Sequence, residues 1–258
     1  MSADRILFVS DLHLDEKFPL AVAQFIQFLQ GDARQCRALY ILGDLFETWI
    51  GDDDDEPARE LVCAALRDFT RHAPCFVLRG NRDFLLGPGF EARSGCRLLP
   101  DPARIDAGDL RLLISHGDLL CTRDVSYQRF REFTRTPGVQ RDFLALPLSA
   151  RRALALRARA GSSAHTRAVA EEIMDVSADA VEALFSVGDA DVLVHGHTHR
   201  PAVHSLRVGD RQCTRIVLGD WYEQGSCLAL SADGRYETLP LPARAGSTLS
   251  MASSSARV

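Results

Sequence analysis

The sequence predicts an α/β fold of 258 residues. Three observations predict it: short continuous apolar runs, amphipathic stretches between those runs, and one long helical segment that interrupts the alternation. The length suits one such domain. With 46% hydrophobic and 25% charged residues, the composition excludes a disordered chain and a membrane channel. A net charge of −5 argues against a nucleic-acid partner.

Five short apolar runs are predicted to be strands, and each stops at a polar residue that could bind a metal. Continuous rather than alternating runs are typical of strands buried on both faces. Amphipathic stretches at Pro19–Leu29 and Pro57–Thr70 are long enough to be crossover helices. Because ligand sites lie beyond the carboxyl ends of such strands, we expect one sheet edge to gather all five polar ends into one cleft. The runs are Arg5–Asp11, Leu39–Asp44, Cys75–Asn81, Arg111–His116 and Asp191–His195.

The segment at about 122–187 is too long for an ordinary connection, and we expect it to form a helical insertion, or cap, over the cleft. Helical patterns cover Ser149–Ala160 and Ala164–Val176. Residues 122–170 hold ten arginines against three acidic residues, a local charge of +7. The planar guanidinium group of arginine can donate parallel hydrogen bonds to a phosphate, so this charge suits a phosphate-containing ligand.

The remainder of the chain returns to short β patterns and then loses its apolar character. The patterns at Thr214–Leu218, Ser226–Leu230 and Arg235–Leu239 predict a second, antiparallel set of strands. The tail 243–258 is rich in Ser, Ala and Gly and is expected to be disordered. We therefore predict one domain over 1–242, carrying the insertion, followed by that tail.

The ends of the predicted strands supply the residues that carry chemistry. Histidine with carboxylate and amide oxygens, and no thiolate, suits a divalent ion such as manganese, iron or zinc. Alternation along a strand points Asp11 and His13 the same way, so both can reach one ion. A single such motif has little weight, but five at five predicted strand ends predict a dinuclear metal site. The motifs are Asp11-Leu-His13, Gly43-Asp44, Gly80-Asn-Arg-Asp83, His116-Gly117 and His195-Gly-His-Thr-His199.

Cysteine usage and the N-terminus predict a cytoplasmic protein. The seven cysteines are an odd number without a C-x-x-C pair, so neither a disulfide framework nor a zinc knuckle is indicated. The first residues lack the order of a signal peptide, and no apolar stretch is long enough to span a bilayer. Any membrane contact is therefore expected to be peripheral.

The order of these motifs across residues 11–199 resembles that of the calcineurin-like metallophosphoesterases. The resemblance implies two central β-sheets flanked by helices, and two divalent ions, usually Mn²⁺. Two such ions can hold a hydroxide and stabilise the attacking and leaving oxygens of phosphoester or phosphoanhydride hydrolysis. The resemblance further implies that Asp44 bridges the ions. One ion would be held by Asp11, His13, Asp44 and His199, and the other by Asp44, Asn81, His116 and His197.

Arg82 stands where most of the family has a histidine. That histidine is the usual candidate for protonating the leaving group, and arginine cannot do so at neutral pH. Arginine can instead brace a phosphate with two parallel hydrogen bonds. Because a phosphate leaving group needs no proton, Arg82 favours a pyrophosphate bond as the target.

Longer blocks resemble one group within the family, the UDP-2,3-diacylglucosamine pyrophosphohydrolases of lipid A biosynthesis. The blocks are His116–Asp124, Tyr127–Arg131, Ile173–Val176, His195–Pro201 and Leu218–Trp221. The resemblance implies hydrolysis of a nucleotide-linked diacylated glucosamine lipid by attack of a metal-bound hydroxide on the α phosphate. The products would be UMP and 2,3-diacylglucosamine 1-phosphate (lipid X). It also implies peripheral binding to the cytoplasmic face of the inner membrane.

The same resemblance implies a set of substrate contacts. Some members carry a lysine where this chain has Val169, and Arg167 is the candidate to replace it. The implied substrate contacts are Asn81, Arg82, Asp124, Ser162, Thr166, Arg167 and His197.

Several alternatives remain at this point. The chain could be another dinuclear phosphoesterase, acting on nucleotides or phosphoproteins, or a non-catalytic scaffold of the same fold, as in retromer. Apolar residues of the insertion could be ordinary packing residues or could line an acyl groove. The acidic run Asp52–Asp55 is expected to be a solvated helix start, and Gly219-Asp220 a structural turn. The apolar residues in question are Phe130, Phe133, Phe143 and Leu144.

Overall fold

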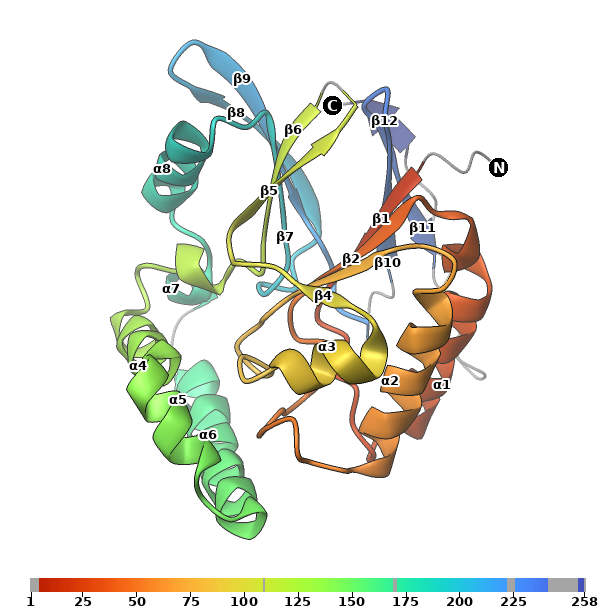
Figure 1. Cartoon of the computed structure of the whole chain (residues 1–258). Helices are drawn as coiled ribbons and strands as arrows, with labels where there is room; N and C mark the ends of the chain where they lie inside the picture. Colours follow the sequence, from red (N-terminus) through yellow and green to blue (C-terminus); the bar gives the residue numbers. More distant parts are fainter. Residues whose placement is uncertain (1–4, 109, 169–170, 222–225, 241–254, 258) are drawn as a thin grey trace.

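The computed structural model describes residues 5–108, 110–168, 171–221, 226–240 and 255–257. Two β-sheets form its centre (Figure 1). The seven-stranded sheet has the order β12-β11-β10-β1-β2-β3-β4, and the five-stranded sheet has the order β5-β6-β7-β9-β8. The first sheet consists of β1 (Arg5–Val9), β2 (Ala38–Leu42), β3 (Cys75–Leu78), β4 (Arg97–Leu98), β10 (Ser226–Ser231), β11 (Arg235–Pro240) and β12 (Ser255–Arg257). The second consists of β5 (Ala103–Ala107), β6 (Leu110–Ser115), β7 (Val192–His195), β8 (Ala202–Val208) and β9 (Arg211–Val217).

The five predicted runs are all strands, but they lie in two sheets and not in one. β1, β2 and β3 are parallel neighbours in the first sheet, and β6 and β7 are parallel neighbours in the second. One apolar cluster joins the sheets, with Phe8 and Leu42 from the first packing among Ile114 and Val194 from the second. A continuous apolar run shows that both faces are buried but not what buries them. The expectation of a single sheet edge was therefore wrong.

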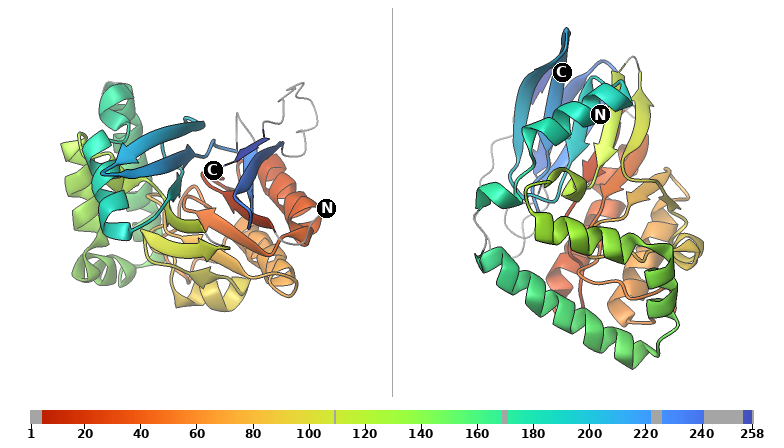
Figure 2. Two further views of the ribbon diagram at one scale, coloured as in Figure 1. Left: turned by 90° about the horizontal axis from the view of Figure 1, so that it is seen from above. Right: turned by 90° about the vertical axis from the view of Figure 1, so that its left-hand side faces the viewer.

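Helices cover the outer face of each sheet, as the left view of Figure 2 shows. The helices α1 (Pro19–Gln30), α2 (Pro57–Phe69) and α3 (Pro88–Ser94) each begin with a proline, whose fixed φ suits the first turn. They bury residues such as Phe25, Leu66 and Phe90 against the seven-stranded sheet. Two short 3₁₀ helices, Asp32–Gln35 and Asp118–Leu120, complete this part of the fold.

The segment predicted as an insertion divides into two parts. The helices α4 (Val125–Arg135), α5 (Pro137–Leu144) and α6 (Leu148–Ala168) lie together, apart from both sheets (Figures 1 and 2). By contrast, α8 (Ala178–Gly188) packs Val181 and Phe185 against the five-stranded sheet. The predicted helix Ala164–Val176 is described in two stretches, α6 up to Ala168 and α7 (Glu171–Met174), while residues 169–170 lie outside the described residues.

Arginines of α6 hold the insertion to the acidic run Asp52–Asp55. Arg151 donates to Asp53, and Arg152 Nη2 donates to Asp54 at 2.8 Å. Asp54 is only 1% exposed, so the expectation of a solvated run was wrong at that residue, whereas Asp53 and Asp55 are exposed as expected. The partners lie 98 residues away, beyond the reach of any local sequence pattern. Only Glu56 behaves as expected of a helix start, since its side chain accepts from Ala58 N at the beginning of α2.

The strands after residue 201 are shared between the sheets. The antiparallel pair β8 and β9 extends the five-stranded sheet, whereas β10 and β11 extend the other. Within the tail expected to be disordered, β12 pairs with β11 through backbone hydrogen bonds, which need no apolar side chains. Residues 241–254 and 258 lie outside the described residues, and there the expectation stays a prediction. All seven cysteines are buried and free. None of the described helices combines the length and hydropathy that crossing a membrane requires.

Candidate active site

The turns that follow the central strands hold the candidate ligands in an uncommon backbone conformation. Six non-glycine residues in the described part of the chain have positive φ, and five of them are candidate metal ligands. Side chains other than glycine rarely adopt this conformation, and residues that do so cluster at functional sites. The five are Asp11, His13, Asp44, His197 and His199, with φ between 49° and 69°.

Hydrogen bonds between turns, one within the seven-stranded sheet and one between the two sheets, fix this arrangement. Asp11 N donates to Gly43 O at 3.1 Å, and His197 N donates to Asp11 Oδ2 at 2.9 Å. A Cβ atom on Gly196 would lie 2.3 Å from Asp11 Oδ2, and one on Gly80 would lie 2.0 Å from Asp44 Oδ1. Glycine is therefore required where these turns approach each other.

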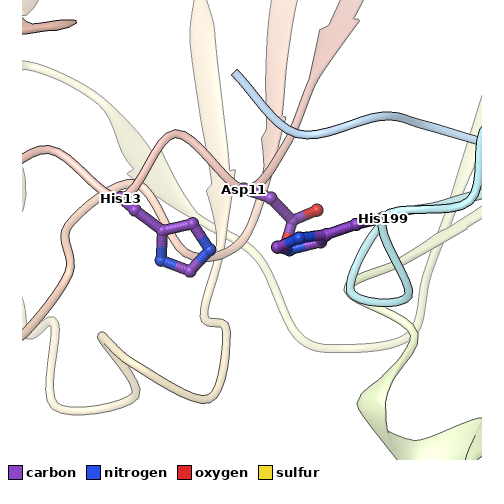
Figure 3. Close-up of side chains that lie close together, drawn as sticks. All are labelled: Asp11, His13 and His199. Atoms are coloured by element: carbon purple, nitrogen blue, oxygen red, sulfur yellow. The ribbon is translucent and has the colours of Figure 1, made fainter. Parts of the chain in front are cut away.

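Asp11, His13 and His199 form the first cluster. Each contributes one donor atom, and the three atoms lie within 4.8 Å of one another. Figure 3 shows Asp11 and His13 on the turn after β1 and His199 on a separate turn, with their side chains gathered together. His199 Nε2 lies 3.3 Å from Asp11 Oδ1. The family resemblance implies that these three residues share one metal ion, and the structure brings them together.

Asn81, His116 and His197 form the second cluster. Asn81 Oδ1 lies 2.9 Å from both His116 Nε2 and His197 Nδ1. The other nitrogen of His116, Nδ1, lies 2.9 Å from Leu42 O, and a carbonyl can only accept a hydrogen bond. His116 therefore carries a proton on Nδ1 and directs Nε2 into the cluster.

Asp44 lies between the two clusters. Its Oδ2 is 3.8 Å from His13 Nε2, and its Oδ1 is 3.8 Å from His116 Nε2. Asp11, Asp44 and His116 form a second group of donor atoms within 4.8 Å of one another. Each carboxylate oxygen of Asp44 thus faces a different cluster, which is the placement that a bridging ligand needs.

The charges of the site favour a cation. Burial lowers the pKa of His116, but the carboxylates of Asp44 and Asp11 outweigh it and raise the pKa to about 9. Burial lowers the pKa of His197 to about 4, and the neighbouring His116 adds to that effect. Buried carboxylates that stabilise positive charge, next to imidazole and amide donors without thiolate, fit divalent ions of the manganese, iron or zinc type.

Two acidic residues outside the predicted ligand set face the histidines. Glu47 Oε2 lies 3.0 Å from His13 Nδ1, and Asp220 Oδ2 lies 3.5 Å from His199 Nδ1. Burial raises the pKa of Glu47, but the hydrogen bond from His13 and nearby charges outweigh it and lower the pKa overall. The Gly-Asp dipeptide at Asp220 was the one available sequence signal, and it was interpreted as a structural turn. Glu47 had no such signal.

Contacts of α4 connect the insertion to the second cluster. The ring of Tyr127 stacks on His197 with centroids 5.9 Å apart, while its hydroxyl donates to buried Asp118 at 2.6 Å. Arg135 Nη2 donates to Gly80 O at 2.9 Å, one residue before Asn81. The insertion is therefore held against the same turn that carries a candidate ligand.

A cavity of about 610 Å³ opens between these clusters and the insertion. Asn81 and Arg82 line it, as do Phe130, Phe133 and Phe143 of the insertion. The cavity is of the size of a small-molecule site. The three phenylalanines thus line a cavity, but Phe143 also packs against the core, and Leu144 is 40% exposed. The role of an acyl groove stays a prediction.

The remaining predicted substrate contacts differ in their positions. Ser162, on α6, lines the cavity. The side chain of Asp124 caps α4 by accepting from Tyr127 N at 2.9 Å. Thr166 and Arg167 belong to α6, but their side chains lie outside the described residues.

Comparison with known proteins decides the family. A family model described as calcineurin-like phosphoesterase matches residues 4–201. The chain therefore belongs to the calcineurin-like phosphoesterases. Membership of this metallophosphoesterase family implies divalent metal ions, and the two clusters of donor atoms supply ligands for them.

Among calcineurin-like phosphoesterases, the chain is similar to proteins named UDP-2,3-diacylglucosamine hydrolase. The one from Stenotrophomonas maltophilia is 51% identical over 236 residues, covering 88% of this chain and 95% of the relative. The one from Xanthomonas oryzae pv. oryzae is also 51% identical, covering 88% and 96%. A solved structure of vacuolar protein sorting 29 from Cryptosporidium parvum matches with a TM-score of 0.51 at 14% identity, covering 99% of this chain and 98% of that chain. This last likeness shows the fold alone.

Proposed function

We propose that this calcineurin-like phosphoesterase hydrolyses the pyrophosphate bond of UDP-2,3-diacylglucosamine, giving UMP and 2,3-diacylglucosamine 1-phosphate. The observation that carries the proposal is the position of Arg82, which lines the apolar cavity next to Asn81 of the second cluster. A phosphate and acyl chains could thus be bound in adjoining parts of one site. The relatives named UDP-2,3-diacylglucosamine hydrolase, about half identical to this chain, support the choice of substrate.

The proposed ligands follow the two clusters. One ion would be held by Asp11, His13 and His199. The other ion would be held by Asn81, His116 and His197, and Asp44 would bind both ions. When bound, two divalent ions supply an activated water and stabilise charge on the attacking and leaving oxygens. Manganese suits these nitrogen and oxygen donors, which include no thiolate.

Arg82 would brace the pyrophosphate. Its Nε is buried and has no hydrogen-bond acceptor within the described residues. A buried donor without an acceptor is costly, and a phosphate oxygen would satisfy it. Arginine cannot protonate a leaving group, so the residue suits a bond whose leaving group is a phosphate. Attack of water on the α phosphate would then release UMP, with the phosphate of 2,3-diacylglucosamine 1-phosphate as the leaving group.

The insertion would hold the lipid. Phe130, Phe133 and Phe143 supply apolar surface for acyl chains, and Ser162 supplies a hydroxyl at the cavity wall. Binding energy from chains remote from the reacting bond can position the pyrophosphate at the ligand clusters. Asp124, Thr166 and Arg167 remain proposed contacts on the resemblance alone.

A lipid substrate of this kind favours a protein that works at a membrane surface. We propose peripheral contact with the cytoplasmic face of the inner membrane. Phe130, Phe133 and Leu154 line the cavity and are also 49%, 60% and 43% exposed. Apolar side chains that continue from a lipid site to the surface suit entry of acyl chains from a bilayer.

One assay tests the proposed function against its alternatives. The purified protein is incubated with UDP-2,3-diacylglucosamine and Mn²⁺, and UMP and the lipid phosphate are quantified. UDP-glucosamine without acyl chains and a small phosphodiester serve as competing substrates. The proposal expects equal amounts of the two products and a strong preference for the diacyl substrate. Equal efficiency without acyl chains would favour a nucleotide phosphoesterase, and no turnover of any substrate would favour a scaffold.

A further inference from the structure

We propose that Glu47 is a positioning residue that couples the candidate ligand His13 to α6 of the insertion. The inference rests on the proposed function, because it takes His13 as a metal ligand. It concerns how the chain orients that ligand, and it assigns Glu47 a role that the motifs do not contain.

The first half of the coupling is the contact between Glu47 and His13. Glu47 Oε2 lies 3.0 Å from His13 Nδ1, and the side chain of Glu47 is 17% exposed. At this ion-pair distance the carboxylate favours a proton on His13 Nδ1, because an ionised carboxylate can only accept a hydrogen bond. Its Nε2 is left with a lone pair, and that atom faces Asp44 Oδ2 at 3.8 Å. Carboxylates in this position fix the orientation and tautomer of a metal-binding histidine.

The second half is the contact between Glu47 and the insertion. Arg159 Nε, on α6, lies 2.5 Å from Glu47 Oε1. The two oxygens of one carboxylate therefore contact a candidate ligand and a helix of the insertion. Glu47 and Arg159 also line the cavity proposed for the lipid.

The backbone keeps Glu47 in place between them. Glu47 N donates to Leu14 O at 3.1 Å, and His13 N donates to Asp44 O at 2.9 Å. The segments that carry Glu47 and His13 are thus joined side by side, and an isolated bridge pairs Leu14 with Phe46. The third partner in this arrangement is α6, so the position of α6 near Arg159 and the orientation of His13 are linked through Glu47.

Linkage of this kind is reciprocal. If docking of Arg159 on Glu47 helps orient His13 for a metal ion, then binding of the ion must favour docking of α6 by the same factor. Metal binding and docking of α6 on Glu47 are then coupled. The coupling predicts effects on metal affinity from a residue of the insertion that touches no metal ligand.

The test measures Mn²⁺ affinity directly, by electron paramagnetic resonance of free Mn²⁺ during titration of chelator-treated protein. The variant Glu47→Ala is expected to bind one of two ions about 10- to 100-fold more weakly. Glu47→Gln keeps a hydrogen-bond acceptor but loses the charge, so its Mn²⁺ affinity should lie between those of the wild type and Glu47→Ala. The matched control is Glu56→Gln, since Glu56 is 13% exposed and caps α2. Thermal melts in chelator check that each variant is folded.

Arg159 supplies the second arm. Arg159→Gln is expected to lower the affinity for the same ion by roughly threefold. In the Glu47→Ala background it should cause no further loss of affinity. Arg157→Gln, an exposed neighbour on α6, is the control. Mn²⁺ should also slow amide exchange in α6 around Arg159 in the wild type but not in Glu47→Ala.

The outcomes separate the two proposals. Two ions bound at wild-type affinity by Glu47→Ala and Glu47→Gln would overturn the positioning role. Unchanged affinity in Arg159→Gln, or additive losses in the double variant, would overturn the coupling to α6. A wild-type protein that binds no Mn²⁺ and releases no UMP would instead overturn the proposed function.

Discussion

Arg151 of α6 donates to Asp53 of the main domain through Nη1 at 2.8 Å, while the same atom donates to Ile50 O at 2.7 Å. Arg151 is 3% exposed, although it carries a full charge. Buried arginines are rare unless they are paired, and this one joins the first turn of α6 to the loop that follows β2. The pair therefore acts as a clamp at the base of the insertion.

Loss of this clamp should loosen the insertion. Arg151→Met keeps the length of the side chain but removes all of its donors, and Asp53, at 62% exposure, can be rehydrated. We therefore expect a loss of about 1–3 kcal/mol in unfolding free energy. Hydrogen exchange should show the largest increase in α6. The control is Arg157→Met on the same helix, and equal protection of α6 in both variants would refute the clamp.

Arg82→Lys tests whether the geometry of the guanidinium matters. Lysine keeps the charge but loses the planar fork, so kcat/KM for the diacyl substrate should fall about 10- to 100-fold. Steady-state release of UMP measures the effect. A lysine variant with the wild-type rate would show that charge alone is sufficient.

The phenylalanines of the cavity should matter for the lipid and not for the reacting bond. Phe130→Ala and Phe143→Ala are expected to lower kcat/KM for the diacyl substrate about tenfold, and to leave a small phosphodiester unaffected. Phe18→Ala is a matched control, since Phe18 is 47% exposed and Phe130 is 49% exposed. If both substrates were affected together and the melting temperature fell, the phenylalanines would be packing residues only.

Removal of metal should destabilise the folded protein. Ions that bind only the folded state stabilise it by about 2.7 kcal/mol at 100 times their dissociation constant. For a chain of this size we expect a chelator to lower the melting temperature by roughly 5–10 °C. Restored Mn²⁺ should reverse the change. An identical melting temperature with and without chelator would argue against a metal centre.

The sequence predicted those features that depend on local patterns. Runs such as Arg111–His116 indicated buried strands, and the polar residue at the end indicated a candidate ligand in four of the five runs. The exception is His195, whose Nε2 lies 3.1 Å from Arg215 Nη1 and which belongs to neither cluster. The structure brings Asp11 and His13 together as predicted, although on a turn with positive φ and not on a strand, and their grouping with His199 followed from the family resemblance.

Features that depend on distant partners could not be predicted from the sequence. Half of the ten arginines counted in the insertion pair with acids of the main domain or with Asp118, as Arg151 does with Asp53. The sequence suggested that their charge served the phosphates of a substrate. Glu47 follows no motif, and its contacts with His13 and with Arg159 of α6 join segments that are far apart in the sequence. Division of the strands between two sheets is also a long-range property, since it depends on which strands face each other.

Asp44 provides the most direct test of the central claim, that the chain is a hydrolase dependent on two metal ions. Its two oxygens face the two clusters, so Asp44→Asn should weaken the binding of both ions and lower turnover by several orders of magnitude. The measurement is UMP release from UDP-2,3-diacylglucosamine by chelator-treated protein restored with Mn²⁺. Asp106→Asn, on the exposed face of β5, is the control and should retain wild-type turnover. The account predicts Mn²⁺-dependent UMP release by the wild type and almost none by Asp44→Asn, and near-wild-type release by Asp44→Asn would contradict it.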